Sequence, residues 1–121
     1  MGKIGLSVAV AVLAVACARA DGGQRLSVDE LQRLVPGATL HGTVADGGTF
    51  EGTYFPDGTM AIRTEGDADT GTWDFEGDTI CLTWTKWRDG KRYCIYWTRE
   101  GEGYASYHID GRLSTRFTIA E

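Results

Sequence analysis

The two histidines, His41 and His108, are the side chains best suited to acid–base or metal chemistry near neutral pH. They lie far apart in the chain and lack the clustered spacing of His, Cys and carboxylate groups that metal ligands show. Ser27, Ser106 and Ser114 lack the context of a catalytic nucleophile elbow and have no obvious base. The sequence therefore predicts a protein that is not an enzyme and that uses no metal or other cofactor.

A basic patch stands out in an acidic chain. The sequence carries 12 Lys and Arg against 17 Asp and Glu, a net charge of −5, which argues against a general nucleic-acid binder. An exposed Trp flanked by cations could bind an anionic partner, a lipid headgroup layer or a protein cleft. The alternative is that charges at a hairpin tip only keep the strands from pairing with other chains. The candidate binding residues of this loop are Lys86, Trp87, Arg88, Lys91 and Arg92.

Cys81 and Cys94 are the two cysteines beyond the N-terminal segment, and both fall on the same face of their predicted strands. In an exported protein they should form a disulfide if the geometry allows it. A two-residue turn at residues 89–90 would place Cys94 opposite Thr85, and Cys81 would then lie about 13 Å away, too far for a disulfide. A wider loop over residues 84–91 would instead bring the two cysteines face to face. We expect the disulfide and the wider loop; the alternative is two buried thiols.

Residues 1–20 have the composition of a secretory signal peptide. Lys3 gives a basic start, residues 4–16 are apolar or small, and Ala18-Arg-Ala20 is a natural cleavage site. We therefore expect a periplasmic or secreted protein with no transmembrane span after processing. Cys17 offers an alternative, because Leu13-Ala-Val-Ala-Cys17 is a weak version of a bacterial lipoprotein signal. In that case lipidation of Cys17 would anchor the protein to a membrane.

Short strands are expected to dominate the mature chain. Ser27-Val-Asp-Glu30 is a capping box that begins a short helix, and Pro36-Gly37 ends it. Apolar and polar residues then alternate in segments separated by Gly- and Asp-rich turns, at about 39–44, 49–55, 59–65, 70–75, 79–85, 92–98, 103–109 and 113–119. Closing such a meander into a barrel removes both of its exposed edges. We predict an all-β fold, in which a signal peptide (1–20) and an arm with one short α-helix (21–37) precede an eight-stranded antiparallel up-and-down, lipocalin-like barrel (38–121).

One face of the predicted strands is apolar nearly throughout. It carries Leu40, Val44, Phe50, Tyr54, Met60, Ile62, Trp73, Phe75, Ile80, Leu82, Trp84, Tyr93, Ile95, Trp97, Leu113, Phe117 and Ile119. In the seventh strand either Tyr104, Ser106 and His108 or Ala105, Tyr107 and Ile109 could point inward. A barrel of this size holds packed side chains or one small ligand, and burying each large apolar side chain is worth about 1.5–3 kcal/mol. We therefore expect a filled interior rather than a ligand cavity.

The order of these features resembles a group of small exported proteobacterial proteins, a domain family of unknown function with a lipocalin-like β-barrel. The features that carry the resemblance are the short helix, Tyr54-Phe-Pro-Asp-Gly-Thr59, Gly71-Thr-Trp73, Gly77-Asp-Thr-Ile-Cys81, Trp84 and Cys94. The resemblance covers nearly all of the mature chain and implies a barrel with a periplasmic address. It brings no catalytic residues with it.

These observations favour a non-enzymatic periplasmic or cell-envelope protein, a binding or structural module that acts through its surface. The expected partner is a periplasmic protein or an anionic envelope component. One alternative is an inhibitor of an exported protease or lysozyme, which would insert residues 21–25 or a barrel loop into an enzyme cleft. Another alternative is a carrier that holds a small apolar molecule in the barrel mouth.

Overall fold

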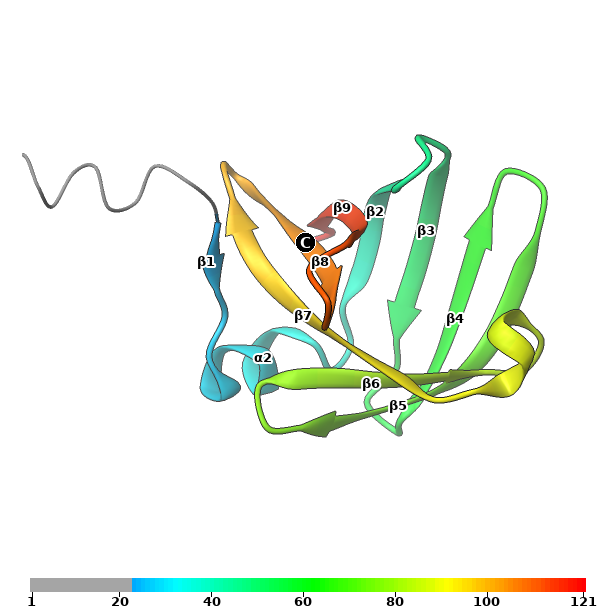
Figure 1. Ribbon diagram of the computed structural model, residues 1–121, viewed down its shortest axis with the longest axis horizontal. Coiled ribbons are helices and arrows are strands. Elements are labelled where there is room, and N and C mark those ends of the chain that lie inside the picture. The colour runs from blue at the N-terminus through cyan, green and yellow to red at the C-terminus, as the bar shows by residue number, and fades with distance from the viewer. Residues whose placement is uncertain (1–22) are drawn as a thin grey trace, which may run out of the picture.

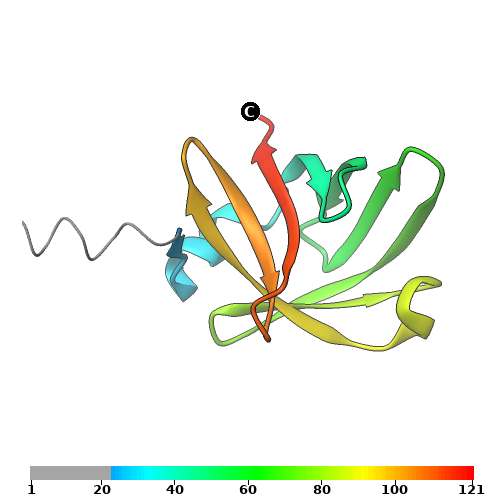
Figure 2. The ribbon, with the colours of Figure 1, turned by 45° about the horizontal axis from the view of Figure 1, so that its top comes forward.

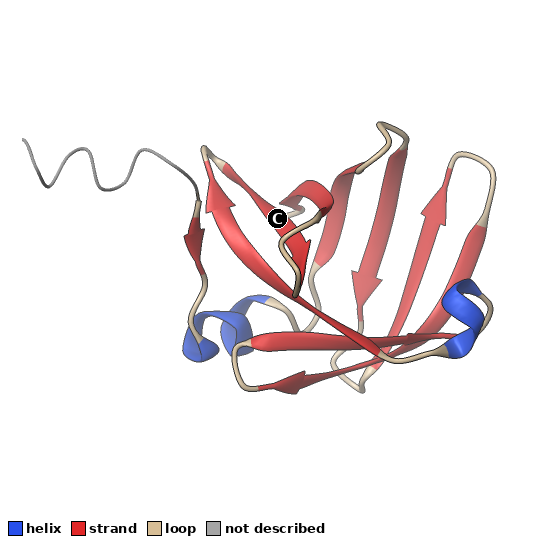
Figure 3. Ribbon diagram, viewed as in Figure 1, coloured by secondary structure: helices blue, strands red, loops and turns tan. Residues whose placement is uncertain are grey.

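The structure, a computed structural model, describes residues 23–121. The predicted signal peptide and Cys17 lie outside the described residues, so their predictions stay untested. The elements are β1 (Gln24–Arg25), α2 (Val28–Leu34), β2 (Thr39–Val44), β3 (Thr49–Tyr54), β4 (Thr59–Thr64), β5 (Ala68–Glu76), β6 (Thr79–Trp84), the 3-10 turn η1 (Trp87–Gly90), β7 (Tyr93–Glu100), β8 (Gly103–His108) and β9 (Leu113–Ile119). Strands dominate, and the segments drawn as helix are α2 and the 3-10 turn η1 (Figure 3).

Strands β2 to β9 form a closed antiparallel barrel (Figure 1). Consecutive strands pair as hairpins from β2 to β9, and the barrel closes where β9 pairs with β2, for example at Phe117 opposite Gly42. This confirms the predicted eight-stranded up-and-down barrel, with strand bounds close to those expected from the alternation of apolar and polar residues.

The short strand β1 was not predicted and is added to one edge of β7. Strand β6 pairs only with the first residues of β7, from Leu82 opposite Tyr93 to Ile80 opposite Ile95. Gln24 and Arg25 pair with the later part of β7. Residues 24–25 of the expected free arm are therefore bonded to the barrel.

Helix α2 covers one end of the barrel, and η1 lies at the other end (Figures 1 and 2). The predicted capping box is present, because the Ser27 hydroxyl accepts from the Glu30 amide while the Glu30 carboxylate accepts from the Ser27 amide. Leu31 and Val35 are fully buried. Leu31 and Val35 thus close this end of the barrel, whereas Val28 on the first turn of α2 is exposed.

The predicted inward face is confirmed by the core. All of its members belong to the buried cluster or pack against it, except Leu113, which lines an internal cavity. In β8 the ambiguity is resolved in favour of Tyr104, Ser106 and His108, which pack against the core or line that cavity, while Ile109 is 60% exposed.

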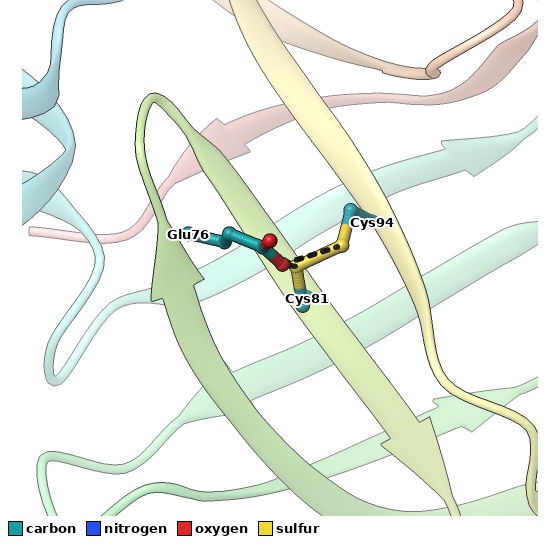
Figure 4. Close-up of side chains that lie close together, drawn as sticks. All are labelled: Glu76, Cys81 and Cys94. Atoms are coloured by element: carbon teal, nitrogen blue, oxygen red, sulfur yellow. Dashed lines mark hydrogen bonds between the residues drawn. A yellow bond between two sulfur atoms is a disulfide. The ribbon is translucent and has the colours of Figure 1, made fainter.

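The predicted disulfide between Cys81 and Cys94 is present, with the two residues directly opposite each other on β6 and β7. Pairing of β6 with β7 stops at Leu82 opposite Tyr93, so the connection is the wider of the two loops considered, and it contains η1. The carboxylate of Glu76 lies beside the two sulfurs (Figure 4). Because both sulfurs are used in the disulfide, this cluster offers no thiolate to a metal ion.

Candidate functional site

A cavity of about 420 Å³ occupies the η1 end of the barrel. One wall is apolar and comes from β3, β4 and β6, with Phe50, Met60, Ile62 and Leu82. The opposite wall comes from β8, β9 and the turn between them and is more polar, with Ser106, His108, Arg112, Ser114 and Thr115. The expectation of a filled interior is therefore correct for the α2 end of the barrel and wrong for the η1 end.

The uneven distribution of aromatic rings explains this difference. Tyr54 makes edge contacts with Trp73 and Trp97, and Trp97 in turn packs on Phe117 with ring centroids 4.7 Å apart. The Trp73 indole donates to the carbonyl of Phe55, in the β3–β4 turn at the α2 end. These rings pack together toward the α2 end, and Tyr54, Trp97 and Phe117 also line the inner side of the cavity. Counting aromatic residues in the sequence could not show where along the barrel axis they lie.

Gly52 enlarges the cavity at the η1 end. It lies on β3 between the inward-facing Phe50 and Tyr54, is buried, and lines the cavity without a side chain. A Cβ placed there would meet only ordinary contacts, the nearest at 3.5 Å from the Ala61 carbonyl oxygen and 3.6 Å from Ile62. A glycine inside a strand is a known sign of missing packing. Gly42 and Gly71 also lie inside strands, but a Cβ there would collide with neighbouring backbone, so the sequence alone could not single out Gly52.

The loop that carries η1 is fixed over the rim by the buried Asp69 of β5. One carboxylate oxygen of Asp69 accepts from the backbone amides of Lys86 and Trp87, each at 2.9 Å. Desolvation opposes ionisation of Asp69, but the bonds from Trp87, Lys86 and Thr70 offset it and leave its pKa below the ordinary value. The carboxylate therefore stays ionised near neutral pH and fixes the start of η1.

Arg88, the residue after Trp87, has left-handed backbone angles (φ 57°, ψ 28°), and so does Asp89. This conformation costs an ordinary residue about 1–2 kcal/mol. It persists here because the loop is held at both ends, by Asp69 on one side and by the disulfide-linked strand β7 on the other. The Arg88 guanidinium lies 3.8 Å from the centre of the Tyr93 ring, at the cavity mouth.

The five candidate loop residues do not form one surface. Trp87 and Arg88 line the cavity, and Trp87 is half-buried rather than fully exposed, with its ring 5.2 Å from that of Trp84. Lys86 forms an ion pair with Asp67 in the β4–β5 turn. Arg92 pairs with Asp74 and Glu76 outside the barrel. Lys91 is exposed and does not line the cavity.

His108 is a site residue that sequence reasoning assigned to no function. It lines the cavity with Arg112, and its ring lies 5.8 Å from that of Tyr93. Desolvation lowers the pKa of His108, and the positive charges of Arg112 and Arg88 lower it further. The imidazole is therefore neutral near pH 7. The sequence could have indicated His108 as a cavity residue only if the inward face of β8 had been known, and the alternation of apolar and polar residues left that face ambiguous.

The indole nitrogen of Trp97 is a buried donor without a protein acceptor among the described residues. The Trp97 side chain is 1% exposed and lines the cavity. A buried donor left unpaired costs about 1–3 kcal/mol.

Of the other candidates for chemistry, Ser106 and Ser114 line the cavity with His108, whereas His41 and Ser27 lie elsewhere. His41 is exposed and lies on the outside of the barrel near Glu51, with 3.6 Å between Nδ1 and the carboxylate. Ser27 caps α2, and the Ser106 hydroxyl bonds Thr115. Within residues 23–121, no hydrogen bond joins His108 to a hydroxyl or a carboxylate.

Fold and site together define a closed antiparallel β-barrel that is covered at one end and hollow at the other. No family model, curated protein or solved structure matches the chain. In the described residues, no helix is both long and apolar enough to cross a bilayer.

Proposed function

We propose that the protein is a non-catalytic binding barrel that takes one small apolar molecule into the cavity at its η1 end. The observation that carries this proposal is the cavity itself. Its volume of about 420 Å³ and its lining of apolar and aromatic side chains with a few polar groups are those of a small-molecule site. Among the functions expected from the sequence, this favours the small-ligand carrier over a module that acts only through its surface.

The arrangement of the basic loop supports the same choice. Lys86 and Arg92 are neutralised by neighbouring carboxylates, so they contribute little to a cationic docking surface. Trp87 turns its ring toward Trp84 and the cavity, and its indole nitrogen donates to Asp67. The loop is thus built as part of the cavity rim. For the inhibitor alternative, pairing of Gln24 and Arg25 with β7 leaves less free chain to insert into an enzyme.

An exported, periplasmic location is part of this proposal, as is membership of the proteobacterial family that the sequence resembles. The signal-like residues 1–20 and the Cys81–Cys94 disulfide support an oxidising compartment. A partner at the cell envelope would then deliver or accept the bound molecule.

Binding can be tested with the neutral fluorescent probe N-phenyl-1-naphthylamine and with 1-decanol. Trp84, Trp87 and Trp97 line the cavity, so their fluorescence should change as either molecule enters. Native mass spectrometry should show one ligand per chain. If neither molecule binds saturably and freshly purified protein carries no small molecule, the proposed function is wrong.

A further inference from the structure

We propose, on the basis of the proposed binding function, that the natural ligand is a small apolar acid whose anionic group lies at the cavity mouth against Arg88. The cavity floor and the wall from β3, β4 and β6 would hold the apolar part. This assigns the ligand a charge, an orientation and a residue that recognises it.

Arg88 is the cation at the mouth that has no carboxylate partner. Among the described side chains, Lys86, Arg92 and Arg112 are each engaged in an ion pair, whereas Arg88 forms none. Its guanidinium carbon lies 3.8 Å from the centre of the Tyr93 ring, and among the described residues its N–H groups have no side-chain acceptor. A planar guanidinium with a free edge is well suited to bind a carboxylate through two parallel hydrogen bonds.

Tyr93, the residue under Arg88, contacts two other residues of the cavity lining, Trp84 and His108. Its hydroxyl accepts from the Trp84 indole nitrogen at 2.8 Å, and its ring packs near His108. The platform under Arg88 is therefore rigid, and Arg88 is preorganised for a ligand. Preorganisation lowers the entropy that binding must overcome.

The charged groups that line the cavity are Arg88, Arg112 and Asp46. Arg112 lines the cavity beside His108, and its charge is shared with Asp110 in the same turn. Asp46 also lines the cavity, but its carboxylate accepts from the Gly48 amide and forms no ion pair with Arg88 or Arg112 among the described residues. An anion would therefore face Arg88 and Arg112 across a neutral imidazole. Among the described residues Arg88 is therefore the unpaired cation of the lining, and it favours an anionic head group over a cationic one.

Three probes with the same chain and different head groups test this inference. Decanoate, 1-decanol and decylamine should be titrated into the full mature chain below their micelle-forming concentrations, with tryptophan fluorescence and calorimetry as readouts. We expect decanoate to bind about tenfold more tightly than 1-decanol, because a charge-assisted pair is worth that ratio. Decylamine should bind more weakly than both.

Two variants of equal charge locate the effect. Arg88→Gln should reduce decanoate binding about tenfold and leave 1-decanol binding within about twofold of wild type. Lys91→Gln removes one positive charge from the same loop but not from the cavity lining, so it should leave both affinities unchanged. As a third readout, decanoate should raise the pKa of His108 in NMR titration, because an anion favours the imidazolium, and 1-decanol should not.

The outcomes separate this inference from the proposed function. If 1-decanol binds and decanoate binds no better, or if both variants weaken decanoate equally, the anionic ligand is wrong and the apolar cavity site stands. If none of the three probes binds, both proposals fall together.

Discussion

Replacing Gly52 with valine should make the protein more stable and less able to bind a ligand. The change removes the conformational freedom that glycine gives the unfolded chain, a gain of about 0.5–1 kcal/mol. It also adds three carbon atoms that point into the cavity, each worth up to about 0.8 kcal/mol when buried. Because the site is only partly enclosed, we expect a net gain of about 2 kcal/mol in the free energy of unfolding.

Gly66→Val is the matched control. Gly66 lies in the β4–β5 turn, and a Cβ placed there has no neighbour within 4 Å. Gly66→Val also reduces the conformational freedom of the unfolded chain, but it buries no side-chain carbons in the cavity. It should therefore change the free energy of unfolding by no more than about 0.5–1 kcal/mol and leave ligand binding intact.

Urea and thermal unfolding measure the effect, with an expected rise in Tm of about 8 °C for Gly52→Val. Titration with N-phenyl-1-naphthylamine should show much weaker binding to that variant. If the barrel were packed at the η1 end, the added methyl groups would instead destabilise the protein by about 1–3 kcal/mol. A fall in Tm for Gly52→Val, with Gly66→Val unchanged, would therefore refute the assignment of the cavity.

Three further results are expected. Reducing the Cys81–Cys94 bond, which links residues with a sequence separation of 13, should lower the free energy of unfolding by about 3 kcal/mol; urea unfolding with and without reductant measures it, and an unchanged midpoint would contradict it. The Ser27 amide and then Arg99 lower the pKa of Glu30 from 4.5 to about 2. Its contribution to stability is therefore present above pH 4.5 and lost as the pH falls toward 2, so the advantage of wild type over Glu30→Gln should vanish over that interval. Asp69→Ala should raise hydrogen exchange at the two loop amides that the carboxylate accepts from, by about tenfold or more, and unchanged protection would show that Asp69 does not hold the loop.

The fold was predictable from the sequence because its information is local. Alternation fixed which face of each strand points inward, and glycine and aspartate marked the turns. The pairing of Cys81 with Cys94 then selected the wide loop over a two-residue turn, because only that register brings the cysteines together.

The candidate site was less predictable because it depends on positions along the barrel axis. The alternating pattern indicates that Gly52 and Trp97 both point inward. It does not show that both line a cavity, nor that Trp97 packs on Phe117 at its inner side. Predicting that Arg88 lies near His108 likewise requires knowing that β8 pairs with β7 and which face of β8 points into the barrel. The basic loop drew attention through its composition, yet its neutralisation by Asp67, Asp74 and Glu76 is a tertiary property.

The attachment of β1 to the late part of β7 sets the direction in which the described chain begins. Gly23 precedes that strand and lies against Arg99 and Glu100, near the β7–β8 turn at the end that α2 covers. A lipid on Cys17, if the alternative processing applies, would therefore tether the barrel by its sealed base. The cavity would then lie at the end of the barrel opposite this attachment.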